Sequence, residues 1–338
     1  MAHTLKLNIW KIKLGTIPWT KNAKNQHLFD KILATSQKTD PFIAFLDAYI
    51  KSFNGKFKEN LSGSKSFAPI SAEIRTKSNS NLIYGFIEGG ITGMVQKVKP
   101  NKNSGKAPVP VSKDEVVAQD HFFLLWIPPD VNYMYLMLQS YKTAHGGLAG
   151  PFFEHLDFFL RKFDFHIGHK EPKVPKSIKN IFKDHAIIVG MDIIKERNGP
   201  TDRSKFNPGL VDAEGLKFVF SVSGLRYSFK KFSSIFKKDQ KGNPFFIDLS
   251  AIGITNPNDY IAKVNYKDPT TGSQTSASLT DLLNIRPAIV IPDSVKIKGL
   301  EKPDISEIYQ FCIKHLQELK LEDNYSTIDV FKDKADNN

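Results

Sequence analysis

The chain has 338 residues, of which 41% are hydrophobic, and its 47 Lys and Arg against 35 Asp and Glu give a formal net charge of +12. That length is enough for two domains whose cores need no disulfide or metal. The single cysteine, Cys312, excludes an internal disulfide and favours a reducing cytoplasm. No apolar run approaches the ~20 residues that span a bilayer, and residues 1–15 alternate polar and apolar positions, unlike a signal peptide. We therefore expect a cytoplasmic protein without a membrane segment.

The positive charge is unevenly spread along the chain. From Glu301 to the end there are nine acidic residues and five lysines, so the excess of Lys and Arg lies in the preceding 300 residues. A basic body followed by an acidic tail is typical of proteins that bind polyanions. The alternative is that Lys and Asn are frequent because the genome is poor in G and C, in which case the charge marks no surface.

The N-terminal part of the chain predicts a mixture of strands and helices. Residues 5–14 alternate strictly enough for a half-buried strand. A helix is predicted from Pro41, because Asp40 occupies the cap position and apolar residues recur after it at helical spacing. Residues 70–76 again have the pattern of a strand. This order of elements favours an α+β fold.

Two β-hairpins are expected next. Residues 81–99 favour a hairpin whose two-residue turn is Gly89-Gly90. Residues 121–141 favour another, in which Pro128-Pro129 interrupts two apolar runs. A glycine-rich turn and an amphipathic helix beginning at Pro151 follow. We expect the strands to join one antiparallel sheet and the helix to cover it.

Residues 99–120 separate the two hairpins and lack periodicity. Their Pro, Lys, Asn and Gly content indicates a long exposed loop. Five lysines and no acidic residue lie between Lys97 and Lys113. Such a loop is most often simply solvated. The functional alternative is an arm that contacts phosphates.

The second half of the chain is predicted to form a separate α+β domain. Its C-terminal helix is expected after Asp304, a capping residue, and residues 229–238 (FKKFSSIFKK) favour a short, amphipathic basic helix. Strands are predicted over 186–195, 216–223, 260–266 and 275–279. The predicted organisation is an α+β protein with mainly antiparallel sheets covered by helices: an N-terminal domain over 1–165, a basic linker over 166–180, a C-terminal domain over 181–322 and an acidic tail over 323–338.

No sequence motif marks an active site. The chain has no GxxxxGK[ST] loop, GxGxxG fingerprint or GxSxG elbow, and one Cys with nine scattered His provides no zinc-ligand spacing. A metal-dependent nuclease needs converging carboxylates. Asp192 and Glu196 would lie ~13 Å apart in an extended strand, too far for one metal ion. We therefore expect no catalytic residue, metal site or cofactor, and a nuclease is kept as an alternative.

Three stretches carry a resemblance of pattern: LIYGFIEGGITGMVQKV (82–98), a long segment from FFLLWIPPD to FFL (122–160), and HAIIVGMDIIKERNGPTD (185–202). Together they resemble the RexA-type proteins, which are phage-exclusion proteins with relatives in bacterial defence loci. The resemblance implies a two-domain α+β homodimer that binds duplex DNA without strong sequence preference. A partner protein from the same locus is a further expectation, and the resemblance supplies no catalytic residue.

The sequence therefore predicts a non-enzymatic protein that binds nucleic acid, DNA rather than RNA, through basic surfaces and with little sequence preference. Each cation would neutralise a phosphate, so affinity should fall steeply with salt. The alternatives are a metal-dependent nuclease and a protein-interaction module in which the lysines have no binding role. The predicted contacts are Lys97, Lys99, Lys102, Lys106, Lys142, Lys173, Lys176, Arg226, Lys230, Lys231, Lys237 and Lys238.

Overall fold

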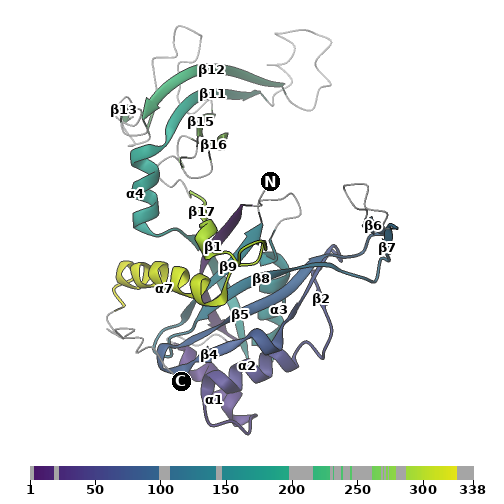
Figure 1. The fold of residues 1–338 in the computed structure, drawn as a ribbon. Coiled ribbons are helices and arrows are strands. Elements are labelled where there is room, and N and C mark those ends of the chain that lie inside the picture. Colours follow the sequence, from purple (N-terminus) through teal and green to yellow (C-terminus); the bar gives the residue numbers. More distant parts are fainter. Residues whose placement is uncertain are drawn as a thin grey trace. The chain divides into compact units, whose positions relative to one another are not determined.

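The chain forms two compact units in its computed structural model (Figure 1): unit 1 consists of residues 1–173 and 289–338, and unit 2 of residues 174–288. Both units are built on antiparallel sheets with helices, so the predicted α+β class is confirmed. Among the described residues, no helix is long and apolar enough to cross a membrane. The structure describes residues 4–18, 23–98, 107–141, 147–197, 216–228, 231, 237–238, 244–245, 261–267, 269, 272, 274–278 and 287–325.

Unit 1 is organised around one large antiparallel sheet with the strand order β10-β1-β9-β8-β5-β3-β2. The N-terminal strand β1 pairs on one side with β9 and on the other with β10 and β17, while β4 pairs with β5. The predicted first strand is thus confirmed. The strands are β1 Leu5–Thr16, β2 Lys58–Glu59, β3 Lys65–Pro69, β4 Arg75–Lys77, β5 Leu82–Ile91, β8 Val117–Trp126, β9 Tyr133–Tyr141, β10 Phe165–Lys173 and β17 Ile289–Val290.

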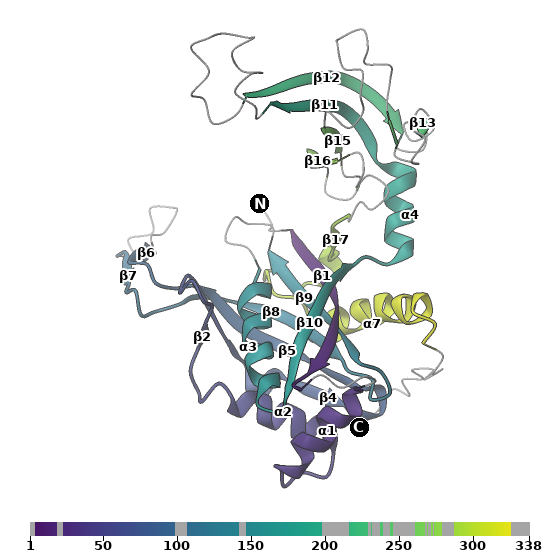
Figure 2. The same ribbon diagram turned by 180° about the vertical axis from the view of Figure 1, so that it is seen from behind.

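Three helices cover one face of this sheet (Figure 2): α1 Asn25–Ala34, α2 Pro41–Lys51 and α3 Ala149–Arg161. The core between them is rich in aromatic side chains. The Phe159 ring, for example, lies 5.2 Å from Phe45 and 5.3 Å from Tyr49, edge to face. The helix predicted from Pro41 is confirmed, because the Asp40 carboxylate accepts hydrogen bonds from the first backbone amides of α2.

The opposite face of the sheet is covered by the C-terminal segment. After β17, helix α7 (Ile305–Glu322) crosses the sheet and buries Ile308, Cys312 and Leu316. Asp304 caps this helix as predicted, accepting hydrogen bonds from the amides of Ser306 and Glu307. Burial raises the pKa of the Cys312 thiol, as expected for a core residue and not for a reactive one.

This return of the chain to unit 1 corrects the predicted domain boundaries. Residues 289–322 were expected in the second domain, but β17 pairs with β1 and α7 packs on the sheet of unit 1. The predicted linker over 166–180 is also wrong. β10 pairs along β1 up to Lys173, and helix α4 (Lys176–His185) follows almost directly. Both errors have one cause, because the partner strand lies far away in the sequence and leaves no local signal.

The predicted hairpin at Gly89-Gly90 is wrong as well. β5 runs straight through both glycines, with β3 on one side and β8 on the other. A Cβ atom on Gly89 would lie 2.6 Å from the carbonyl oxygen of Ser66, and one on Gly90 would overlap the carbonyl oxygen of Val117. The glycines therefore allow neighbouring strands to approach and do not make a turn. The hairpin of β8 and β9 is confirmed.

Two shorter predictions also change. Residues 71–73 form a 3-10 turn, so the strand expected over 70–76 begins only with β4. The region 99–120 was expected to be a long exposed loop. It contains β7 (Val109–Val111), which pairs with β6 (Gln96–Val98), and the start of β8 at Val117.

Unit 2 contains a four-stranded antiparallel sheet with the order β12-β11-β15-β16. Along β15 the side chains alternate between exposed and buried, with Ala262, Val264 and Tyr266 on the buried side. Helix α4 packs against that side, where the Phe182 ring lies 5.0 Å from the Tyr266 ring, edge to face. The strands of unit 2 are β11 Ile187–Arg197, β12 Leu216–Ser228, β13 Lys237–Lys238, β14 Pro244–Phe245, β15 Ile261–Lys267 and β16 Gln274–Ser278.

Candidate nucleic-acid interface

The predicted phosphate contacts fall in both units. In unit 1, Lys97 is exposed on β6, whereas Lys173 is half-buried on β10 and pairs with Glu171 at 2.7 Å. In unit 2, Lys176, Arg226 and Lys231 are exposed. Lys237 and Lys238 form β13, of which only the backbone is described. Lys99, Lys102, Lys106, Lys142 and Lys230 lie outside the described residues, as does most of the basic helix expected over 229–238.

One face of the unit 2 sheet is exposed to solvent. Residues directly opposite each other in an antiparallel pair point to the same side of the sheet, so the register defines this face. Ser221, Asp192 and Lys263 form one row across β12, β11 and β15. We call this surface the open face and define it by Asp192, Ser221, Arg226, Lys263, Asn265 and Lys267.

Three cations belong to the open face. Lys263 and Lys267 are four residues apart on β15, so they lie ~13 Å apart along the strand, and both are exposed. Arg226 is exposed on β12. Its neighbour Tyr227 pairs with Ile188 on the buried side, so Arg226 belongs to the open face. Among the side chains described on this face, Asp192 alone carries a negative charge, so the face is basic.

Asp192 is fixed within the open face by its neighbours. Its carboxylate accepts hydrogen bonds from the Ser221 hydroxyl at 2.6 Å and from the Asn265 amide at 2.9 Å. These two hydrogen bonds, with help from Lys263, hold the pKa of Asp192 below its ordinary value although burial opposes them. The ionised carboxylate therefore orients polar side chains from two adjacent strands. This is a supporting role and not that of a proton donor.

Helix α4 adds a second basic surface in unit 2. Lys176, Lys179 and Lys183 are spaced three and four residues apart, which places them on one side of the helix. Phe182, three residues after Lys179, is buried at the edge of this side. The sequence prediction included Lys176 alone. The helical spacing of lysines in KSIKNIFKDH, like the strict alternation of IAKVNYK in β15, is the signal that identifies the missing residues Lys179, Lys183, Lys263 and Lys267.

Unit 1 contributes a two-stranded ribbon formed by β6 and β7, in which Lys97 pairs with Pro110. The ribbon extends from the ends of β5 and β8 (Figure 1). Apolar side chains on β7 and in the two residues before β6 are exposed, with Met94 at 57%, Val95 at 78% and Val109 at 61% of their full area. Exposed apolar side chains grouped in this way indicate a contact surface, and the ribbon leads into the lysine-rich residues 99–106.

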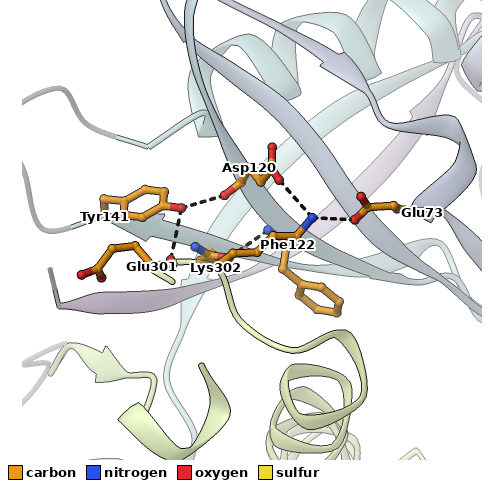
Figure 3. A network of polar contacts seen from close by, with 7 residues as sticks. Glu73, Asp120, Phe122, Tyr141, Glu301 and Lys302 are labelled. Atoms are coloured by element: carbon orange, nitrogen blue, oxygen red, sulfur yellow. Dashed lines mark hydrogen bonds and ion pairs between the residues drawn. The ribbon is translucent and has the colours of Figure 1, made fainter. Parts of the chain in front are cut away.

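A polar cluster under the C-terminal segment joins Lys302 to two carboxylates (Figure 3). Its ammonium nitrogen lies 2.8 Å from Glu73 and 3.0 Å from Asp120. The Tyr141 hydroxyl donates a hydrogen bond to the Asp120 carbonyl oxygen at 2.9 Å. Burial alone lowers the pKa of Lys302, but the hydrogen bonds to Glu73 and Asp120 outweigh it and raise the pKa above its ordinary value. The ammonium pairs with both carboxylates, so the cluster holds the C-terminal segment on the sheet.

The buried pair of Ser52 and His155 has the residue types of a nucleophile and its base, but the wrong geometry. The Ser52 hydroxyl donates its proton to the Tyr49 carbonyl oxygen at 2.6 Å and lies 2.8 Å from Nε2 of His155. The imidazole must then donate to the hydroxyl, which is the reverse of base catalysis. Elsewhere in the described part of the chain, no three His, Cys, Asp or Glu side chains gather to hold a metal ion.

Comparison with models of protein families, with curated proteins and with solved structures finds no match for this chain. The basic surfaces described above therefore carry the functional argument.

Proposed function

We propose that the protein binds nucleic acid, in the first place duplex DNA, through the open face of unit 2. The observation that carries the proposal is that Arg226, Lys263 and Lys267 share one exposed sheet face with hydroxyl and amide side chains. These residue types make most protein contacts to phosphate and sugar. Unit 2 has 17 Lys and Arg against 11 Asp and Glu, a larger excess per residue than the 30 against 24 of unit 1.

The composition of the open face favours duplex over single-stranded nucleic acid. Proteins that hold single strands stack the bases on exposed aromatic rings. In the described part of unit 2, Tyr227, Tyr266 and the partly exposed Phe220 lie on the side of the sheet opposite the open face. Cations held at fixed spacing on strands suit a regular array of phosphates, and such contacts carry no sequence information.

The test is fluorescence anisotropy of a labelled 30-mer duplex, repeated at salt concentrations from roughly 50 to 300 mM. We expect affinity to fall along a straight line when its logarithm is plotted against that of the salt concentration. Replacing the three open-face cations (R226Q, K263Q and K267Q together) should reduce the slope by about three, because each of these cations would neutralise one phosphate.

A triple variant of unit 1 is the matched control, because it removes the same charge from exposed positions. K31Q, K51Q and R161Q replace side chains that are 45%, 74% and 54% exposed. This control should leave the slope unchanged. Equal losses in both triple variants would mean that net charge alone attracts the DNA, and no binding at the lowest salt would mean that the charge of +12 is compositional.

A second candidate function, binding of a protein partner, is favoured by the ribbon of unit 1. Met94, Val95 and Val109 are exposed together, and such patches mark interaction sites. The test is the double variant M94S/V95S. It should abolish recovery of a partner protein and leave DNA affinity unchanged. The nuclease alternative is tested with the same preparation by incubating plasmid with Mg²⁺ or Mn²⁺, and we expect the plasmid to stay intact.

The resemblance to RexA-type proteins supports a wider proposal, that the protein acts in the bacterial cytoplasm in defence against phage, as a homodimer and with a partner from its own locus. Phage plating on cells that produce the chain or its open-face triple variant tests the role. Light scattering tests the dimer. Equal plating on cells with and without the protein would reject the role in defence.

The acidic tail is proposed to screen the basic surface until a ligand displaces it. The structure refines the deletion that tests this proposal. Asp323 accepts hydrogen bonds from Lys11 and Tyr135, both at 2.7 Å, and Tyr325 packs against Trp126. Removal of residues 326–338 keeps these interactions and should tighten DNA binding. Unchanged affinity would reject the screening role.

A further inference from the structure

Asp192 lies on the central strand of the open face. That strand, β11, runs between β12 and β15, and Asp192 has Ser221 of β12 and Lys263 of β15 as its register partners. The cations of the face stand on the two outer strands, with Arg226 on β12 and Lys263 and Lys267 on β15. The open face therefore combines a hydrogen-bond acceptor on its central strand with positive charge on both neighbouring strands.

The Asp192 carboxylate is held in one orientation. Its Oδ1 accepts a hydrogen bond from the Ser221 hydroxyl at 2.6 Å and its Oδ2 accepts one from the Asn265 amide at 2.9 Å. A carboxylate oxygen can accept two hydrogen bonds, so each oxygen has the capacity for one more. Asp192 is partly exposed, and Gly190, two residues earlier on the same side of β11, has no side chain to shield it. The lowered pKa of Asp192 keeps this acceptor ionised at neutral pH.

A fixed carboxylate on a surface that binds phosphates requires a ligand group that donates a hydrogen bond. The DNA backbone has no such donor, because phosphate and sugar oxygens only accept. In the major groove the donors are the N4 amino group of cytosine and the N6 amino group of adenine. Adenine places the acceptor N7 beside its amino group, which repels a carboxylate, whereas the edge of cytosine presents the amino group alone. The chemistry of Asp192 therefore matches cytosine.

The width of the three strands suits the major groove. Neighbouring strands lie ~4.8 Å apart, so the axes of β12 and β15 are about 10 Å apart. The major groove is ~12 Å wide, and sheet proteins place strands in it. With β11 over the base edges, Arg226 on one outer strand and Lys267 on the other are directed to the phosphates of opposite rims.

We propose that Asp192 is a specificity-determining residue that accepts a hydrogen bond from the N4 amino group of cytosine in the major groove of duplex DNA. The inference rests on the proposed function, because it concerns the same face and the same ligand. The cations hold the backbone whatever the sequence, and Asp192 adds a preference for G·C pairs. Ser221 and Asn265 are positioning residues, because they act by orienting the carboxylate.

The probe is a labelled duplex of G·C pairs, compared by fluorescence anisotropy with the same duplex made with N4-methylcytosine. The methyl group replaces the amino hydrogen that points into the major groove and leaves the base-pairing hydrogen in place. N4 methylation should weaken binding about tenfold, because one charge-assisted hydrogen bond is lost. Replacement of guanine by inosine is the matched control. It removes only the amino group in the minor groove and should leave affinity unchanged.

Two variants assign the preference to Asp192. D192N keeps the shape of the side chain and removes its charge. It should lose most of the difference between the two duplexes and bind the N4-methylated duplex more tightly than the unchanged protein does, because a repelling charge is gone. D184N is the matched control. Asp184 is exposed on α4, which packs against the buried side of the same sheet, so D184N makes the same change in net charge and should keep the difference.

The outcomes separate this inference from the proposed function. Equal affinity for the methylated and unmethylated duplexes, with a steep salt dependence, would overturn the role of Asp192 and leave DNA binding by the open face intact. A difference retained in full by D192N, or weakening by inosine in place of N4 methylation, would overturn it as well. No binding of any duplex at the lowest salt would overturn both proposals. Unliganded melting temperatures check that the variants are folded.

Discussion

Unit 1 covers both faces of its sheet, whereas unit 2 leaves one face of its sheet exposed. In unit 1, helices α1 to α3 pack on one side and the C-terminal segment on the other, so strand residues of both faces, such as Leu136 and Trp126, are buried. In unit 2, β15 buries Val264 on one side and exposes Lys263 on the other. The comparison separates a packed body from a sheet whose polar face is available for contact.

The sheets of the two units differ in how many strand residues are used for packing. A sheet covered on both sides uses almost all of its strand residues for packing. A sheet covered on one side has a full set of positions free of packing constraints. In unit 2 those positions hold Lys, Arg, Ser and Asn together with Asp192 and the exposed apolar side chains of Val219 and Ile261. Changes to the body should therefore alter stability, and changes to the open face should alter binding alone.

The largest expected effect is acid destabilisation of unit 1. Burial lowers the pKa of His121, His155 and His315 to about 4, against about 6.5 in an unfolded chain. Below pH 6.5 the unfolded state binds more protons, so stability falls as pH falls and is lost progressively down to pH 4. At pH 5 each histidine should cost ~2 kcal/mol. Urea unfolding at pH 7 and pH 5 measures this, and equal midpoints for unit 1 would contradict it.

The second effect compares two neighbouring phenylalanines of α3. Phe159 is 1% exposed and lies in the aromatic core, whereas Phe158 is 55% exposed. F159A should lower the free energy of unfolding by about 3–5 kcal/mol, because it removes buried apolar surface and leaves a cavity. F158A should change it by less than ~1 kcal/mol. Chemical denaturation of both variants gives the two values, and similar losses would show that the helices of unit 1 do not form its core.

The third prediction compares substitutions on the two faces of β15. V264A removes a fully buried side chain and should cost about 2 kcal/mol. K263Q, one residue away and exposed, should leave stability unchanged within ~0.5 kcal/mol and should reduce the salt dependence of DNA binding by about one in slope. Paired denaturation and anisotropy measurements test both statements. A large stability loss in K263Q would mean that the open face is a packed surface.

The smallest effect concerns the fastening of the C-terminal segment. K302M leaves Glu73 and Asp120 without their shared cation. Since these carboxylates are partly exposed, the loss should be about 1 kcal/mol. K51M, which breaks only the exposed pair with Asp47, should cost less. Hydrogen exchange of α7 measures the effect locally, because faster exchange in K302M than in K51M is expected only if the cluster holds the helix on the sheet.

Much of the fold was predictable because local patterns determine it. The alternation at 5–14, the cap at Asp40 and the cap at Asp304 all correspond to elements of the structure. The glycine pair at 89–90 was not predictable. A glycine that makes a turn and a glycine that admits a neighbouring strand look the same in sequence. The difference depends on Ser66 and Val117, which belong to other strands.

The candidate surfaces were predictable only in part. The sequence identified Lys176 and Arg226 from runs of positive charge, but it did not include Lys263 and Lys267, which stand singly in the alternating segment IAKVNYK. Their significance arises from register, since β11, β12 and β15 place them beside Ser221 and Asn265. The surroundings of Asp192 were not predicted either, because its hydrogen-bond partners Ser221 and Asn265 lie 29 and 73 residues away in the chain.

The sequence by itself determined the α+β class, the positive charge and most helix and strand positions, because these depend on residue type and on spacings of a few residues. The tertiary structure decided that residues 289–322 return to the first sheet, which cations share a face, and which side chains hold Asp192. These features depend on pairing between distant segments. Such pairing is set by the burial of whole faces and not by any local pattern.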